Sequence, residues 1–145
     1  MAVLEEHMKI GMLLWMLNNR LSARCNKELE EIELTVSQSE IIAYLIHNED
    51  REVNQRDIEL EFKLMNPTVT GILNRLEKKG FVKRTKSKND RRYKRVELTE
   101  KGSELKEKML EKVIESKKHL FRGISDDELN AFGNTLRILI NNISD

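Results

Sequence analysis

The segment NPTVTGILNRLEKKG, residues 66–80, carries polar side chains whose types and spacing suit recognition of a surface. We expect Asn66 to cap a helix, Pro67 to occupy its first turn and Gly80 to end it in a left-handed conformation. At 3.6 residues per turn, one face of this helix is apolar and the other is small, polar and basic. Such side chains contact base edges and phosphates in the grooves of DNA. The candidate contact residues on this helix are Asn66, Pro67, Thr68, Thr70, Gly71, Asn74, Arg75 and Lys78.

Gly71 lies on the polar face of the same predicted helix. A glycine inside a helix costs about 0.8–1 kcal/mol relative to alanine. One use for it is to let the helix backbone approach another surface closely, as in a DNA major groove. The alternative is an ordinary amphipathic helix whose polar face is only solvated.

Positive charge is concentrated directly after this helix. Residues 78–95 contain ten basic residues and one acidic residue, so the segment carries +9, and the remainder carries −8 to give the net charge of +1. A charge run is often only a solvated face. Its position beside the polar helix instead favours a local contact with a polyanion. The candidates here are Lys86, Lys88, Asp90, Arg91 and Arg92.

Asp90 and Arg92 form the most specific pair in the basic segment. An arginine at a hairpin tip can enter the minor groove, and a carboxylate two residues earlier can orient it through a forked hydrogen bond. The alternative is that Asp90 only supports the turn and that Arg92 is one of ten interchangeable cations.

Enzymatic sites find little support in the sequence. His7, His47 and His119 lie on three separate predicted segments without a second histidine at metal-ligand spacing, and the glycines form no phosphate-binding motif. The single cysteine, Cys25, excludes an intrachain disulfide and a multi-thiolate zinc site. We therefore expect no catalytic residue, no metal and no cofactor.

Apolar runs are too short to span a bilayer, and the N-terminus carries two glutamates where a signal peptide has basic residues. We expect no membrane partner and a cytoplasmic location.

The predicted elements around the polar helix form a recognisable unit. Asn54 can cap a short helix that a turn at residues 63–65 joins to the polar helix, which makes a helix-turn-helix. Residues 81–85 and 93–98 are strand-like and flank the polar segment 86–92, which makes a basic hairpin. A helix-turn-helix followed by such a hairpin is a winged helix.

The segment from Val53 to Gly102 resembles the MarR family of bacterial transcriptional regulators. VNQRDIELEFKLMNPTVTGILNRLEKKGFVKR is similar to the family's helix-turn-helix, and NDRRYKRVELTEKG is similar to its wing. The wing pattern is an Asp, any residue and an Arg, then a strand ending in Leu-Thr-x-x-Gly. In this chain the pattern falls on Asp90, Arg92, Leu98, Thr99 and Gly102.

Two residues depart from the family pattern. Lys63 stands where the family commonly has a glycine in the turn, so we expect a left-handed lysine there. Glu59 stands where a small buried alanine is usual. Cys25 lies late in the first helix, whereas peroxide-sensing members have an earlier cysteine; redox sensing through Cys25 stays an alternative.

Long apolar stripes in the terminal segments exceed what one subunit can bury. The first helix, residues 6–29, and the last helix, which a capping box at Ser125 and Glu128 begins, each carry a stripe of this kind. The resemblance also implies that the first and last helices form a dimer interface. The candidate interface residues are Met8, Met12, Trp15, Leu129, Phe132, Leu136, Leu139, Ile140 and Ile143.

The sequence thus predicts a mainly α fold with a small β-hairpin wing. Residues 1–34 and 101–145 are expected to dimerise, and residues 35–100 are expected to bind double-stranded DNA, within one compact domain. The expected function is a homodimeric transcriptional regulator, a repressor, on a near-palindromic operator with half-sites about 10 bp apart. The resemblance implies a small-molecule effector pocket near Trp15. The alternative class is a winged helix that docks a protein partner.

Overall fold

The computed structural model describes residues 1–144. The chain divides into two compact units, residues 1–109 and the remainder, and each is described by itself. The first unit contains α1 (Ala2–Glu30), α2 (Val36–His47), α3 (Gln55–Phe62), α4 (Asn66–Lys78), β1 (Val82–Lys86), β2 (Lys94–Leu98) and the first half of α5 (Glu100–Leu120). The second unit contains the rest of α5 and α6 (Asp126–Ile143).

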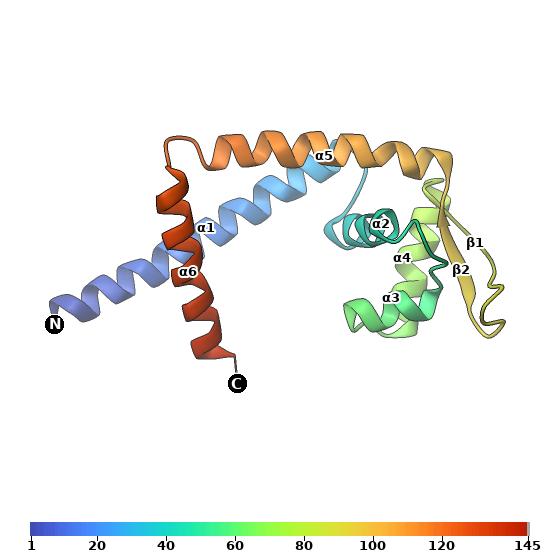
Figure 1. The fold of residues 1–145 in the computed structure, drawn as a ribbon, viewed down its shortest axis with the longest axis horizontal. Coiled ribbons are helices and arrows are strands. Elements are labelled where there is room, and N and C mark those ends of the chain that lie inside the picture. Colours follow the sequence, from blue (N-terminus) through green and yellow to red (C-terminus); the bar gives the residue numbers. More distant parts are fainter. Residues whose placement is uncertain (145) are drawn as a thin grey trace. The chain divides into compact units, whose positions relative to one another are not determined.

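Strands β1 and β2 form an antiparallel hairpin that follows α4 (Figure 1). Val82 pairs with Leu98 at the base, and Lys86 pairs with Lys94 towards the tip. The backbone N–H of Val96 donates to the carbonyl oxygen of Val53 at 2.8 Å, so the segment before α3 joins the edge of β2. Helices α2, α3 and α4 followed by this hairpin make a winged helix-turn-helix, which confirms the predicted fold class.

Side-chain caps set most of the helix starts, as the sequence predicts. Capping boxes form between Thr35 and Gln38 at α2, between Asn54 and Asp57 at α3, and between Ser125 and Glu128 at α6. The hydroxyl of Thr99 accepts the backbone N–H of Gly102 at 3.1 Å and caps α5. Each cap satisfies backbone donors that would otherwise lack a partner.

Three local expectations differ from the structure. The N-cap of α4 is Met65, and the Asn66 side chain bonds elsewhere, so the predicted Asn66 cap is wrong. The sequence also contains a capping-box pattern at Ser37 and Glu40 that predicts a helix start, but this prediction is wrong, because Ser37 already lies inside α2. Helix α1 begins at Ala2, four residues before its predicted start at Glu6.

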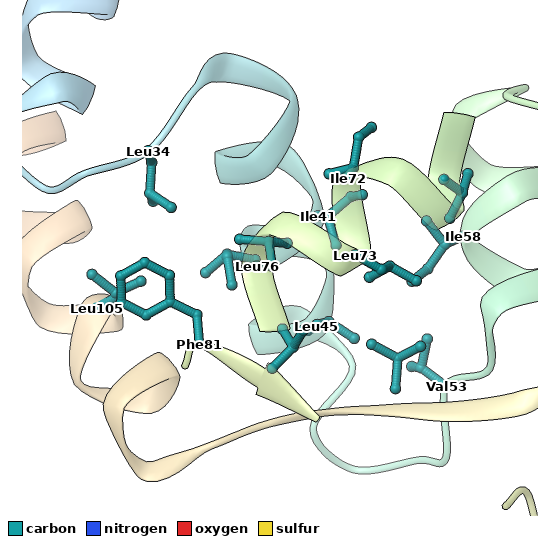
Figure 2. Close-up of a cluster of buried hydrophobic side chains, with 14 residues drawn as sticks. Leu34, Ile41, Leu45, Val53, Ile58, Ile72, Leu73, Leu76, Phe81 and Leu105 are labelled. Carbon is teal, nitrogen blue, oxygen red and sulfur yellow. The ribbon is translucent and has the colours of Figure 1, made fainter. Parts of the chain in front are cut away.

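The core of the first unit gathers around α4 (Figure 2). Ile41 and Ile58 reach it from α2 and α3, Leu73 and Leu76 from α4, and Phe81 from the start of the hairpin. All of these side chains are almost fully buried. Packing on three sides holds the inner face of α4 in place and leaves its opposite face free.

Gly102 shows why the wing pattern ends in glycine. A Cβ at this position would lie 2.0 Å from the carbonyl oxygen of Phe81, a distance that no side chain can occupy. The same Phe81 oxygen accepts the backbone N–H of Thr99 at 3.1 Å. Gly102 therefore lets the first turn of α5 lie directly against the base of the hairpin.

Within residues 1–144, none of the helices has the length and apolar character needed to cross a bilayer.

Candidate nucleic-acid interface

Helix α4 has two unlike faces, as its sequence predicts. Val69, Ile72, Leu73 and Leu76 are buried. The exposed residues of α4 are Asn66, Pro67, Thr68, Asn74, Arg75, Glu77 and Lys78. Six of the eight candidate contact residues on this helix are therefore open to a partner, and Thr70 and Gly71 are half-buried.

The C-terminal end of α4 is fixed by a Schellman motif. The backbone N–H of Phe81 donates to the carbonyl of Leu76, and that of Gly80 donates to the carbonyl of Glu77, both at 3.0 Å. Gly80 has φ +81°, the left-handed conformation expected of it. This motif turns the chain sharply from α4 into β1.

The turn before α4 contains the left-handed lysine that the sequence predicts. Lys63 has φ 52° and ψ 43°, and its backbone N–H donates to the carbonyl oxygen of Glu59. A residue with a Cβ adopts this conformation at a cost of about 1–2 kcal/mol. The turn therefore keeps its geometry with a lysine in place of the glycine that the resemblance implies.

Thr70 is held by α3 and only partly faces outwards. Its hydroxyl accepts a hydrogen bond from Nε2 of Gln55 at 2.7 Å, and Gln55 itself is buried. Thr70 therefore ties α4 to α3, a role that the helical wheel did not indicate.

Asn74 is exposed, but its carbonyl oxygen is occupied. The guanidinium of Arg84, on β1, donates through Nη2 to Oδ1 of Asn74 and through Nε to Oε2 of Glu77, the latter at 2.9 Å. This contact also holds the pKa of Glu77 below its ordinary value, chiefly through the hydrogen bond from Arg84. Asn74 therefore presents its amide N–H donors outwards.

Sequence reasoning counted Arg84 only as one of ten cations. A signal was available, because side chains two apart on a strand share a face. Val82 is buried against α4, so Arg84 is placed on that same side.

Packing within residues 1–144 does not require a glycine at position 71. Among residues 1–144, no atom outside its own helix lies within 4 Å of the position that a Cβ at Gly71 would take. The backbone is thus accessible from the polar side of α4, as close approach to another surface requires.

The predicted forked pair is present in the wing. Arg92 donates from Nε to Oδ1 of Asp90 at 3.0 Å and from Nη2 to Oδ2 at 2.8 Å, and its backbone N–H also donates to Oδ1. The Arg92 hydrogen bonds hold the pKa of Asp90 below its ordinary value. The Arg92 side chain is 78% exposed, and its guanidinium lies over the ring of Tyr93. Asp90 therefore orients an arginine that remains accessible.

The tip of the wing is anchored by a contact that sequence reasoning missed. Ser87 is buried, and its hydroxyl donates to Oε1 of Glu52, which also accepts the backbone N–H of Lys88 at 3.1 Å. The hydroxyl of Ser87 is the main cause of the lowered pKa of Glu52. The same hydroxyl accepts the backbone N–H of Asp90 at 3.0 Å. Glu52 and Ser87 are far apart in sequence, so no local pattern could reveal the pair.

The remaining wing candidates are exposed cations. Lys86, Lys88 and Arg91 are open to solvent, and together with Ser87 they line a hollow at the hairpin tip. Three positive side chains around one hollow suit the phosphate backbone of a nucleic acid.

Most of the candidate dimer residues are exposed within the described part of the chain. Met8, Met12 and Trp15 on α1 are between 58% and 70% exposed. On α6, Phe132, Leu139, Ile140 and Ile143 are exposed, and Leu129 and Leu136 are half-buried. Cys25 is an exposed free thiol on α1.

Three comparisons agree with this architecture. A model of the MarR family matches residues 34–94. The HTH-type transcriptional regulator FarR of Neisseria gonorrhoeae is 32% identical over 115 residues, which are 79% of this chain and 77% of FarR. The crystal structure of the transcription regulator MarR from Oenococcus oeni PSU-1 has a TM-score of 0.66 and 32% identity, and the match covers 91% of this chain and 98% of that one.

A structure of the S. aureus MepR–DNA complex is also similar, with a TM-score of 0.75 and 24% identity over 93% of this chain and 98% of that one. At this identity the likeness shows the fold alone.

The fold and the exposed basic surface define a winged-helix, DNA-binding regulator of transcription. The chain belongs to the MarR family. Its relatives are transcription regulators, which confirms the prediction of a regulator and not an enzyme.

Proposed function

We propose that this protein is a homodimeric repressor that binds a near-palindromic operator in double-stranded DNA. Helix α4 enters the major groove of each half-site, and the wing reaches the adjacent minor groove. Residues 35–100 bind the DNA, and residues 1–34 and 101–145 form the dimer. Because its target is DNA, the protein acts in the cytoplasm.

The observation that carries this proposal is the polar, basic outer face of α4. Its exposed residues include only one apolar side chain, that of Pro67, among those from 66 to 78. A protein-docking helix would present more apolar surface. Gly71 permits close backbone approach, and the adjoining wing adds exposed cations and the oriented Arg92.

The residues divide into two roles. Thr68 and Asn74 contact base edges, whereas Arg75 and Lys78 contact phosphates. Because Arg84 occupies Oδ1 of Asn74, the free amide N–H groups of Asn74 suit an acceptor atom on a base. Family membership supports a small-molecule effector that releases the DNA.

Selection from a pool of random-sequence duplexes with the purified protein tests the proposal. We expect one enriched near-palindromic sequence with half-sites about 10 bp apart. With that duplex, Asn74→Ala should lose about 1–3 kcal/mol and relax preference at one base position. Lys78→Ala should weaken cognate and random duplexes alike and reduce the salt slope by about one.

Two outcomes contradict the proposal. The first is the absence of any enriched sequence in the selected pool. The second is an equal effect of Asn74→Ala on cognate and random DNA, which would show that α4 does not read sequence.

A further inference from the structure

The contact between α3 and α4 contains a buried acidic residue, Glu59. Its side chain is 4% exposed. A charge removed from water needs hydrogen-bonding partners, because an unpaired buried carboxylate is strongly disfavoured. The partners of Glu59 therefore indicate what the carboxylate is used for.

Two donors approach the two oxygens of this carboxylate separately. Nδ2 of Asn66 donates to Oε1 at 2.7 Å, and Nη1 of Arg56 donates to Oε2 at 3.1 Å. Burial raises the pKa of Glu59, but the hydrogen bonds from Asn66 and Arg56, the charge of Arg56 and a smaller contribution from Gln55 outweigh burial, and the pKa lies below its ordinary value. The carboxylate is thus ionised at neutral pH and accepts from both side chains.

The two donor residues lie at helix starts that favour anions. Asn66 is the first residue of α4, and Arg56 is the second residue of α3. Asn66 is exposed, and the Arg56 side chain is 49% exposed. A guanidinium has five N–H donors and an amide has two, so both keep donors that Glu59 does not use. The N-terminal end of each helix adds partial positive charge.

We propose that Glu59 is a positioning residue whose carboxylate holds Arg56 and Asn66 as a pair of donors to the phosphate oxygens beside the major groove. Arg56 thereby joins the DNA contacts, although it lies outside the recognition helix and the wing. The inference rests on the proposed function, because it needs α4 to lie in the groove.

Fold stability alone does not account for this arrangement. Removing one partner of a buried pair is strongly destabilising when it leaves the other charge buried, but Arg56 and Asn66 are exposed and would be hydrated without Glu59. Alanine also favours the helix more than glutamate does. The folded protein should therefore tolerate Glu59→Ala, and the change should act on DNA binding instead.

The test compares Glu59→Ala with Glu61→Ala, which removes an exposed acid from the same helix. Both are titrated against a labelled duplex selected by the intact protein. Simple electrostatics predicts tighter binding for each, because each removes a negative charge from a DNA-binding surface. We expect Glu61→Ala to bind equally or more tightly and Glu59→Ala to bind about tenfold more weakly. We also expect Glu59→Ala to reduce the salt slope by about one, because the Arg56 contact is lost.

A double-mutant comparison separates positioning from a general change in structure. Asn66→Ala alone should also weaken binding, and adding it to Glu59→Ala should cause little further loss, since both remove the same oriented donor. Circular dichroism checks folding, and Glu59→Gln, which keeps the size and one acceptor oxygen, replaces Glu59→Ala if the latter does not fold.

The test distinguishes a failure of the proposed function from a failure of the positioning role of Glu59. If the intact protein selects no duplex, the proposed function itself is wrong. If the intact protein binds its duplex and Glu59→Ala binds as tightly or more tightly, the proposed function stands and the positioning role of Glu59 is wrong. Fully additive losses in the double mutant also overturn that role.

Discussion

Single residues in the wing decide whether it acts as an oriented contact or as a diffuse positive patch. The fork between Asp90 and Arg92 fixes the guanidinium plane at an exposed position. A fixed guanidinium enters a narrow minor groove with less loss of side-chain entropy than a free lysine. Arg91 and Lys88 are exposed cations nearby and provide natural comparisons.

The first residue-scale prediction follows from this difference. Arg92→Ala should lose far more affinity for the selected duplex than Arg91→Ala or Lys88→Ala, although each removes one positive charge. Asp90→Ala should also weaken binding, even though it makes the wing more positive. Titration of labelled duplex with the four variants at one fixed salt concentration measures these differences.

Acid should abolish the orientation of Arg92 by Asp90. The pKa of Asp90 is lowered in the folded state, so the fork is complete above the ordinary aspartate pKa and is lost as the pH falls through the lowered value.

The substitutions at Arg92, Arg91 and Lys88 could instead lower DNA affinity equally, or Asp90→Ala could bind more tightly. Either result would mean that the wing is only a diffuse basic patch.

Side-chain contacts could be predicted from the sequence only where the two residues lie close together along the chain. The fork joins residues two apart, and a carboxylate near an arginine in a turn indicates it directly. The contacts of Ser87 with Glu52 and of Arg84 with Asn74 join different elements, so they appear only once the hairpin is placed against the helices. Glu59 was noticed as a departure, but its partners Asn66 and Arg56 required the fold.

Helix α4 is the element that the rest of the first unit positions. The apolar spacing that predicts its buried face is a local property, and so is its glycine stop. The helix start was less predictable, because Asn66 can either cap its own helix or bond to another element. Its bond to the buried Glu59 carboxylate is charge-assisted and stronger than a cap to a backbone N–H.

The element-scale prediction concerns Gly71 in the middle of α4. Gly71→Ala should raise the free energy of unfolding by about 0.8–1 kcal/mol, since alanine favours the helix and the site has room for a methyl group. The same change should lower affinity for DNA, because the methyl group holds the helix away from the groove. Urea unfolding at a fixed protein concentration and duplex titration measure the two effects.

Gly11→Ala provides the control for this substitution. Gly11 lies inside α1, and its surroundings among residues 1–144 are equally open. It should show the gain in stability without the loss in DNA affinity, with sedimentation confirming that assembly is unchanged. A stabilised Gly71→Ala protein with full affinity would mean that close backbone approach is not required.

At the scale of the whole molecule, the terminal helices carry apolar surface that the described residues do not cover. Neither α1 nor α6 contains a buried residue within residues 1–144. Stable dimers bury roughly 1,200–2,000 Å² in total, and burial contributes about 25 cal/mol per Å² of apolar surface. The spacing of the apolar residues could be predicted from the sequence. The geometry of a dimer could not, because it depends on contacts with a second chain that local sequence patterns do not determine.

The final prediction is that the intact protein sediments at twice its chain mass of 17.1 kDa at micromolar concentration. Ile140→Lys places a charge in the apolar stripe of α6, where the side chain is 57% exposed, and should shift the protein towards monomer. Asn134→Lys adds the same charge at an exposed polar position of α6 outside that stripe and should leave the dimer intact.

Removing the chain from Ser125 onwards should give an aggregating or unfolded product, because the dimer and the fold of the second unit share the same apolar side chains. A stable monomeric form of the intact protein would remove the physical basis for binding a near-palindrome, since a single copy presents one α4 to one half-site.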